Sequence, residues 1–373
     1  MLVYFMVDFL IALFGVMFAN RRIKIRENHI DDNSGNNIYF FLVVVLLIFI
    51  SSFRGDFTSD YTGYEDIYYR FSNITLEAIW KRSLFTYPEK GYLLFQYIIK
   101  HVFNDVIWLY IVSSIIIVIS NAYQIKKYSP NLLLAFMLFV EVGTYYTSFN
   151  IMRHILAVSI VMLGSSFLIE KKPIKFFVFV IIAGFIHSSA FFMIPLYFVM
   201  HIKFRKKSIF VYPIIFVVLV VALPTVIRFV QRYYWSWYFT GEWQYGGYTW
   251  KSVIIPLIMG IFSIGTYMIE HKGRSDTNSS QTQREDVSIT WDDTENVLLN
   301  ATFFHLAFAL MGLQLTLMSR FSAFLSLYSI LFFCNQVEKS KYRKLIIIVV
   351  VILATAYCQI TRNDYPYYFI WNR

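Results

Sequence analysis

The sequence predicts an all-α fold: a polytopic integral membrane helix bundle with about twelve transmembrane helices and with interfacial or re-entrant helices on its outer face. Of the 373 residues, 58% are hydrophobic, 20% are aromatic and only 15% are charged, and soluble domains of this size are not so apolar. Apolar runs of roughly 20 residues, the length that crosses a bilayer, recur along the chain. Lys and Arg cluster at the ends of these runs, as orientation signals do. We therefore interpret residues 1–373 as a single membrane domain.

The positions of Lys and Arg also predict the orientation of the chain. Because loops rich in these residues stay in the cytoplasm, the basic segment 21–26 makes Val3–Ala19 cross inward and Tyr39–Phe53 return outward. The same rule, applied along the chain, leaves both termini outside. The predicted spans are Val3–Ala19, Tyr39–Phe53, Val106–Tyr123, Leu132–Phe149, Ile151–Ile169, Ile174–Ile186, Ser188–Met200, Ile209–Val230, Trp250–Ile269, Val297–Met318, Phe321–Val337 and Leu345–Ile360.

Two segments depart from a simple span. Tyr92–Phe103 is too short to cross, and counting it as a crossing would invert every later loop against the positive charges, so we interpret it as re-entrant or interfacial. Ile174–Ile186 and Ser188–Met200 form a pair of short helices broken at His187, with basic residues at both far ends, so the break faces outward. A broken helix is tolerated at this depth only where protein or a wet cavity satisfies its backbone. His187 therefore either lines a cavity, as a base, hydrogen-bond donor or clamp, or ties the turn to a neighbouring helix.

Three loops stand out between the spans. Residues 54–105 form an outer loop that includes interfacial or re-entrant helices. Residues 231–249 form a second outer loop, whose aromatic side chains suit sugar stacking as well as anchoring at the membrane surface. Residues 271–296 are hydrophilic and are predicted to be a flexible cytoplasmic loop. The net charge of +10 does not indicate nucleic-acid binding, because the basic residues lie at the ends of spans.

Four arginines, Arg54, Arg153, Arg320 and Arg362, lie at the outer ends of predicted spans. A guanidinium group suits a diphosphate, since it donates paired hydrogen bonds and keeps its charge when partly desolvated. Any single one of them is equally compatible with an anchor in the lipid headgroups. Arg153 begins a segment with small residues, which is typical of a face packed inside a bundle. Glu141 falls near the middle of a span, where it is costly unless it is paired.

Acidic and histidine side chains supply the candidate bases. Asp60, Glu89 and His187 are the candidates for taking a proton from a sugar hydroxyl, and the sequence does not rank them. His154 is assigned a packing role. The acidic residues show no spacing specific for a metal, and the sequence contains no nucleotide-phosphate loop, zinc pattern or nucleophile elbow. We therefore predict no metal site and no cofactor.

The sequence resembles the EpsG-like branch of the Wzy-type polysaccharide polymerases over nearly its whole length, in motifs that follow the order and approximate spacing of that family. Its most specific part is the Phe-x-His-x-Ser-Ala motif ahead of a proline. The motifs are Arg54 with Asp60, Tyr61 and Tyr64; Glu89-Lys90-Gly91-Tyr92; Asn150-Ile151-Met152-Arg153; Phe185-Ile186-His187-Ser188-Ser189-Ala190 with Pro195; and Arg320 ahead of Phe321.

The resemblance implies a glycosyltransferase of the bacterial cytoplasmic membrane whose active site faces the outer side. It would transfer a growing glycan from its undecaprenyl diphosphate carrier to a new lipid-linked repeat unit, making an O-antigen, capsule or exopolysaccharide. The implied partners are the lipid-linked donor and acceptor, membrane lipid, a chain-length regulator and a flippase. The implied diphosphate- and substrate-binding residues are Arg54, Arg153, Arg320, Tyr64 and Tyr92.

Two other classes remain open. An O-antigen-ligase-like enzyme, or a transferase of single sugars from a polyprenyl phosphate donor, would share these charged residues and differ in its substrates. A flippase or transporter of lipid-linked glycans should instead line a central path with charges and show inverted repeats.

Overall fold

The computed structural model describes residues 2–19, 25–26, 29–30, 34–71, 73–83, 86–203, 214–215, 217–218, 221, 225, 250–274, 291–362 and 366–372. The chain divides into two compact units, and each is described by itself. The first unit combines Met1–Ile194 with Cys334–Arg373, and the second is Pro195–Phe333.

Helices dominate the described residues, as the sequence predicts. Two strands of two residues each, β1 (Ile25–Arg26) and β2 (His29–Ile30), pair antiparallel. The helices in chain order are α1 (Leu2–Phe18), α2 (Ser34–Ser52), α3 (Tyr61–Arg70), α4 (Leu76–Lys81), α5 (Lys90–Phe103), α6 (Ile107–Tyr128), α7 (Leu132–Glu141), α8 (Thr147–Asn150), α9 (Met152–Leu163), α10 (Ser165–Ile169), α11 (Pro173–Ile186), η1 (Ser188–Phe192), α12 (Met193–Met200), α14 (Trp250–Arg274), α15 (Trp291–Gly312), α16 (Thr316–Lys339), α17 (Arg343–Thr361) and η4 (Ile370–Asn372).

Five of these helices are long and apolar enough to cross a membrane, which makes the chain an α-helical membrane protein. The predicted span Ile209–Val230 lies largely outside the described residues, and the second outer loop, 231–249, lies entirely outside them, so the count of about twelve spans stays a prediction. The five helices contain Ser34–Ser52, Ile107–Tyr128, Trp250–Glu270, Thr316–Lys339 and Arg343–Thr361. Shorter apolar helices are Leu2–Phe18, Leu132–Glu141, Met152–Leu163, Pro173–Ile186 and Ser188–Met200.

Two predicted spans are divided inside their apolar runs, and a third, Val297–Met318, runs past the end of α15 at Gly312 into α16. The run Leu132–Phe149 divides into α7 and α8, because the chain leaves the helix around Gly143, whose N–H donates back to the carbonyl of Leu138 over 2.9 Å. The run Ile151–Ile169 divides at Gly164 into α9 and α10. Both breaks fall inside apolar runs, and hydropathy alone does not detect a break of this kind. The helix that carries Arg153 is therefore shorter than a full span.

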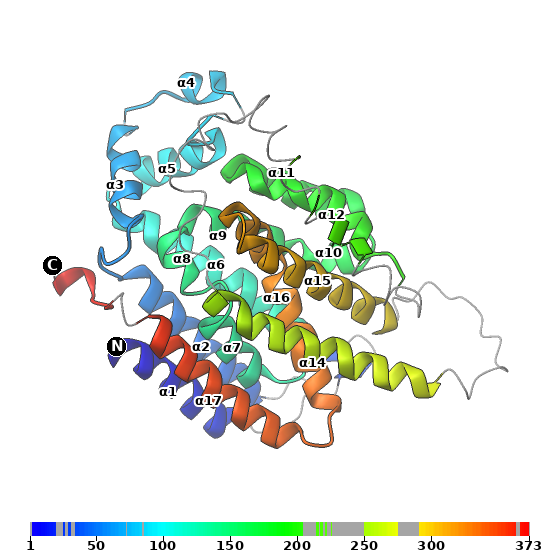
Figure 1. Ribbon diagram of the computed structural model, residues 1–373. Helices are drawn as coiled ribbons and strands as arrows, with labels where there is room; N and C mark the ends of the chain where they lie inside the picture. Colours follow the sequence, from blue (N-terminus) through cyan, green and yellow to red (C-terminus); the bar gives the residue numbers. More distant parts are fainter. Residues whose placement is uncertain are drawn as a thin grey trace. The chain divides into compact units, whose positions relative to one another are not determined.

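Polar side chains join the central helices of the first unit. In Figure 1, α6 lies among α2, α5 and α9, and it packs against both α2 and α9. The amide of Asn121 on α6 donates to the hydroxyl of Ser159 on α9 over 3.0 Å, and Gln124 donates to the carbonyl of Met162 over 2.8 Å. Such hydrogen bonds and small residues hold helices together in a membrane, where apolar contact with lipid competes with apolar contact between helices. They join the second half of α9 to α6.

The predicted outer loop 54–105 contains three helices, α3, α4 and α5. They lie together at the top of the view in Figure 1, close to α11, and α5 packs directly against α11. Local sequence sets where α4 begins: the hydroxyl of Thr75 accepts a 3.2 Å hydrogen bond from the backbone of Ala78 and so caps this helix. The segment Tyr92–Phe103 lies in α5, a helix of 14 residues.

One oxygen of the buried Glu141 carboxylate has a hydrogen-bond partner, and the other, Oε2, has none among the described residues. Glu141 lies at the end of α7 and accepts a 2.8 Å hydrogen bond from the hydroxyl of Thr355 on α17. Asp8 on α1, equally buried, accepts from Gln359 over 3.4 Å. The helices α1, α7 and α17 pack against one another, and these two contacts tie α17 to both neighbours.

Candidate active site

A buried ion pair joins the start of α5 to the start of α9. The Nη1 atom of Arg153 lies 2.6 Å from Oε2 of Glu89, and the two side chains are 10% and 7% exposed. Glu89 immediately precedes α5, where its side chain does not cap the helix. Because the pair is buried, water screens its two charges only weakly and their electrostatic attraction is strong. Loss of either partner therefore lowers the stability of the fold substantially.

The second carboxylate oxygen of Glu89 reaches the break between α11 and η1. Oε1 accepts a 3.1 Å hydrogen bond from the backbone N–H of Ser188. This contact requires α5 to approach α11 closely, and Gly91 permits it: a Cβ atom there would lie 2.6 Å from the backbone oxygen of Phe185. The predicted break at His187 is confirmed, since α11 ends one residue before it and η1 begins one residue after it. The break leaves backbone N–H groups without helical partners, and the Glu89 carboxylate accepts a hydrogen bond from one of them, the N–H of Ser188.

Three tyrosines surround Arg153. Its Cζ atom lies 4.6 Å from the ring centroid of Tyr87 and 5.6 Å from that of Tyr92, within the range of cation–π contacts. The hydroxyl of Tyr64 accepts a 3.4 Å hydrogen bond from the backbone N–H of Arg153. Burial raises the pKa of both Tyr64 and Tyr92, so both phenols stay neutral at physiological pH. The two tyrosines predicted to bind substrate therefore lie against Arg153.

The second arginine, Arg54, is 2% exposed. One of its terminal nitrogens donates to the carbonyl of Ser51, and the other lies 3.3 Å from the sulfur of Met152. Its Cζ atom lies 4.9 Å from the ring of Tyr110 and 5.2 Å from that of Phe149. Among the described residues it forms no ion pair with a carboxylate, and its Nε has no hydrogen-bond partner. Burial lowers the pKa of Arg54, and a bound anion would offset that desolvation.

The segment 366–372 covers Arg54 from the far end of the sequence. Arg54 and Phe369 form an isolated antiparallel bridge. The N–H of Gly55 donates to the carbonyl of Tyr368 over 2.8 Å. The resemblance to a polymerase family extends to this segment, and the structure shows that it packs against the first motif.

Asp60, which directly precedes α3, is joined to the motif that carries Arg153. Its backbone N–H donates to Oδ1 of Asn150 over 3.2 Å, and the hydroxyl of Ser59 donates to the same oxygen over 3.0 Å. Asn150 lies three residues before Arg153. Tyr64, one turn after Asp60 on α3, interacts electrostatically with both Asp60 and Arg153. Two motifs that are about 90 residues apart in sequence thus meet at one place.

Two imidazoles and one hydroxyl meet at the break after α11. Oγ of Ser189 lies 2.8 Å from Nδ1 of His187 and 3.2 Å from Nδ1 of His154, and the ring centroids are 4.9 Å apart. His154 therefore makes a polar contact in addition to the packing role assigned to it, and Ser189 was named in the His187 motif without being given a role. Two features of the sequence indicate polar roles for these residues: His154 directly follows Arg153, and Ser189 lies two residues after His187.

The structure brings Arg54 and Arg153 close together through Met152, which contacts the first and precedes the second. Arg320 belongs to the second unit, where it lies in the first two turns of α16. Its assignment to a diphosphate stays a prediction. Among the residues that the structure describes, no three His, Cys, Asp or Glu side chains are placed to hold a metal ion.

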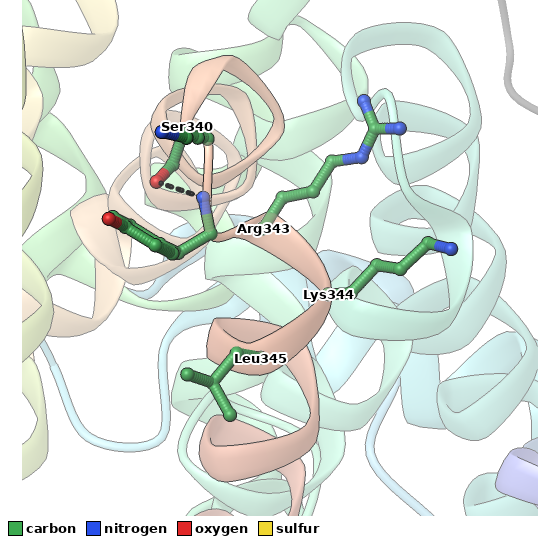
Figure 2. A pocket seen from close by; sticks show the side chains of 6 residues that line it. Ser340, Arg343, Lys344 and Leu345 are labelled. Carbon is green, nitrogen blue, oxygen red and sulfur yellow. Dashed lines mark hydrogen bonds between the residues drawn. The ribbon is translucent and has the colours of Figure 1, made fainter.

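A depression of about 500 Å³ opens at the turn between α16 and α17 (Figure 2). Arg343 in its lining lies 3.2 Å from a carboxylate oxygen of Glu338, and the basic side chains here are those that predict a cytoplasmic turn. No predicted site residue lines this depression. Its lining residues are Ser340, Lys341, Tyr342, Arg343, Lys344 and Leu345.

The residues that meet in the first unit form what we call the Arg153 cluster. Its guanidinium groups suit a multiply charged anion, its carboxylates and imidazoles suit proton transfer, and its aromatic rings suit sugar faces. The cluster consists of Arg54, Asp60, Tyr64, Glu89, Tyr92, Arg153, His154, His187 and Ser189.

In the comparison with protein families, the EpsG family matches residues 37–369 of the 373. This range includes every residue of the Arg153 cluster. Comparisons with curated proteins and with solved structures gave no match.

Proposed function

Because the chain belongs to the EpsG family, we propose that it is a glycosyltransferase that polymerises oligosaccharide repeat units. The units would be carried on undecaprenyl diphosphate, and the product would be a bacterial surface polysaccharide such as an O-antigen, capsule or exopolysaccharide. The observation that carries this proposal is the burial of two arginines in the same part of the first unit: Arg153, which is paired with Glu89, and Arg54, which has no carboxylate partner among the described residues. A diphosphate leaving group needs that kind of charge.

In the proposed reaction, a hydroxyl of the acceptor repeat unit attacks the anomeric carbon of the donor glycan. The bond between this carbon and the diphosphate oxygen breaks, and undecaprenyl diphosphate leaves with the electron pair. The hydroxyl proton passes to a base. Arginine catalyses such a step by stabilising the negative charge that develops on the leaving oxygen.

Arg153 and Arg54 are the proposed diphosphate ligands in the first unit, and Arg320 is a third that sequence assigns. Arg153 is held in place by Glu89, so its orientation is fixed before substrate arrives. Arg54 has no carboxylate partner among the described residues, and an anionic ligand would supply one.

Asp60, Glu89 and His187 are the proposed candidates for the base, because each lies within the cluster. Tyr64 and Tyr92 would contact the sugar or the diphosphate with neutral hydroxyl groups and ring faces.

The proposal includes an orientation. With about twelve spans and both termini outside, the cluster would face the periplasm or the cell exterior, on the outer side of the cytoplasmic membrane. This is the side on which a flippase would deliver lipid-linked repeat units, and a chain-length regulator would act on the growing product there.

The test uses purified protein in detergent with a lipid-diphosphate-linked repeat unit and no other enzyme, and products are resolved as a glycan ladder on a gel. Wild type should give a ladder. Arg153→Lys keeps the charge and loses the planar fork, so we expect the rate to fall about 10²-fold or more. Arg70→Lys is the matched control, since Arg70 lies exposed at the end of α3 and the rate should not change.

An unchanged rate for Arg153→Lys would remove Arg153 from the diphosphate site. Transfer of a single sugar, or of a finished glycan to a different acceptor, would favour the ligase-like or single-sugar enzyme. Movement of the intact lipid across vesicles without any ladder would refute the enzyme and favour a flippase.

A further inference from the structure

The hydroxyl of Ser189 contacts the Nδ1 atoms of two histidines, His187 at 2.8 Å and His154 at 3.2 Å. A serine hydroxyl has one hydrogen and can therefore donate to only one of them; toward the other it must accept. The neutral imidazole ring likewise carries a hydrogen on one nitrogen only. These two rules limit where the protons can be.

A backbone hydrogen bond shows which nitrogen of the His187 ring carries the hydrogen. The N–H of Ser189 points at Nδ1 of His187 over 3.3 Å, and a backbone N–H is always a donor. Nδ1 of His187 is therefore an acceptor and carries no hydrogen, so neutral His187 has its proton on Nε2. The short contact from Oγ to the same nitrogen must then use the serine hydrogen.

His154 follows by elimination. Because the hydrogen of the Ser189 hydroxyl is directed at His187, the remaining contact requires Nδ1–H of His154 to donate to Oγ. The order of donation runs from His154 to Ser189 to His187. His187 and Ser189 lie at the break that Glu89 stabilises through the N–H of Ser188, and His154 lies on α9 directly after Arg153.

We propose that His154 and Ser189 are positioning residues that hold His187 as the Nε2–H tautomer, so that His187 donates a hydrogen bond to a diphosphate oxygen instead of acting as the base. In this form neither ring nitrogen of His187 can take up a proton from the acceptor hydroxyl: Nδ1 already accepts from Ser189, and Nε2 already carries a hydrogen. Proton acceptance is left to the carboxylates, Asp60 and Glu89. The role of His187 as a donor to the diphosphate rests on the proposed polymerase function. The tautomers assigned to His187 and His154 do not depend on that function.

The tautomers are measured by nuclear magnetic resonance on full-length protein in lipid nanodiscs with ¹⁵N-labelled histidine. The chain has 7 histidines, and the spectra of His187→Gln and His154→Gln identify the two of interest. We expect a bare Nδ1 and a protonated Nε2 for His187, and a protonated Nδ1 for His154. His101 is an internal standard, since its Nδ1 lies 2.8 Å from the carbonyl of Tyr97 and must carry hydrogen.

Substitutions at Ser189 test the positioning. Ser189→Ala removes the acceptor for His154, so the signal of a protonated Nδ1 in His154 should weaken toward a mixture of tautomers. Ser189→Thr keeps the hydroxyl and should keep the wild-type spectrum.

The polymerisation assay tests the role of His187. The amide of Gln can donate from near the position of Nε2 but cannot serve as a base, so His187→Gln should be at least about tenfold more active than His187→Ala. His101→Gln should be as active as wild type, because His101 is exposed on α5.

A protonated Nδ1 on His187 would overturn the proton assignment. The expected tautomers together with equal inactivity of His187→Gln and His187→Ala would overturn the donor role. If wild type polymerises nothing while the tautomers are as stated, the proposed function fails and the proton assignment stands.

Discussion

Replacing Glu89 by Gln leaves the guanidinium group of Arg153 buried opposite a neutral amide. The nitrogen and oxygen of the pair are 2.6 Å apart, and the side chains are 10% and 7% exposed. Two unit charges about 4 Å apart attract by about 4 kcal/mol at an effective dielectric constant of about 20. Removal of one partner from a buried pair typically costs about 3–5 kcal/mol, because the remaining charge is not compensated. We therefore expect Glu89→Gln to lower the free energy of unfolding by about 3 kcal/mol.

A double-mutant cycle separates this attraction from other effects of the substitution. Arg153→Met removes the charge and keeps an apolar side chain, and the variant carrying both changes has no buried charge at this position. The double variant should be more stable than the sum of the single losses predicts, by about 2 kcal/mol or more. The assay is equilibrium unfolding in mixed micelles, followed by tryptophan fluorescence.

The exposed pair Lys81–Glu77, on α4, is the matched control. Its atoms are 2.5 Å apart, but its side chains are 74% and 76% exposed, so Glu77→Gln should cost less than about 0.5 kcal/mol. Losses at Glu89 and Arg153 that add within about 0.5 kcal/mol would refute the reasoning, since independent sites behave in that way.

Three further outcomes are expected. Arg54→Met should abolish the glycan ladder yet change the free energy of unfolding by less than about 1 kcal/mol, because no described carboxylate loses its partner; a large loss of stability would show that Arg54 is structural. Gly91→Ala should cost about 1–3 kcal/mol in the same unfolding assay, since its Cβ would lie 2.6 Å from the backbone of Phe185, whereas Gly63→Ala, with nothing within 4 Å, should stabilise by about 0.5–1 kcal/mol; equal effects would contradict the close approach of α5 and α11. Glu141→Gln should keep stability within about 1 kcal/mol, because the amide still accepts from its partner on α17, and a loss of several kcal/mol would mean that the charged form is required.

Hydropathy and charge predicted the helical membrane class, the order of the helices and the break at His187, because these depend on residues close together in sequence. They did not predict where α7 ends. The run after it stays apolar, and the turn is stabilised by backbone hydrogen bonds around Gly143, which leave no mark on hydropathy. The same limitation applies to the division of α9 from α10 at Gly164.

The members of the Arg153 cluster were named from the sequence, but their pairing was not. Nothing in the order of residues says that Glu89 pairs with Arg153, since this depends on how α5 and α9 pack. His154 illustrates the same point: a histidine in an apolar helix is usually a packing residue, and only the approach of Ser189 from η1 gives it another role. Roles assigned by pattern therefore require the tertiary contacts before they can be ranked.

The closure of the Arg54 site by segment 366–372 has a consequence for biogenesis. The hydroxyl of Tyr367 donates to the carbonyl of Ile50 over 2.8 Å, across 317 residues of sequence. Since a chain is made and inserted from its N terminus, α2 enters the membrane long before the ribosome reaches Tyr367. Throughout that time Arg54 is not yet covered by segment 366–372, so its charge is accommodated by water or lipid headgroups. A nascent chain that stops after α15 therefore lacks the segment that covers this arginine.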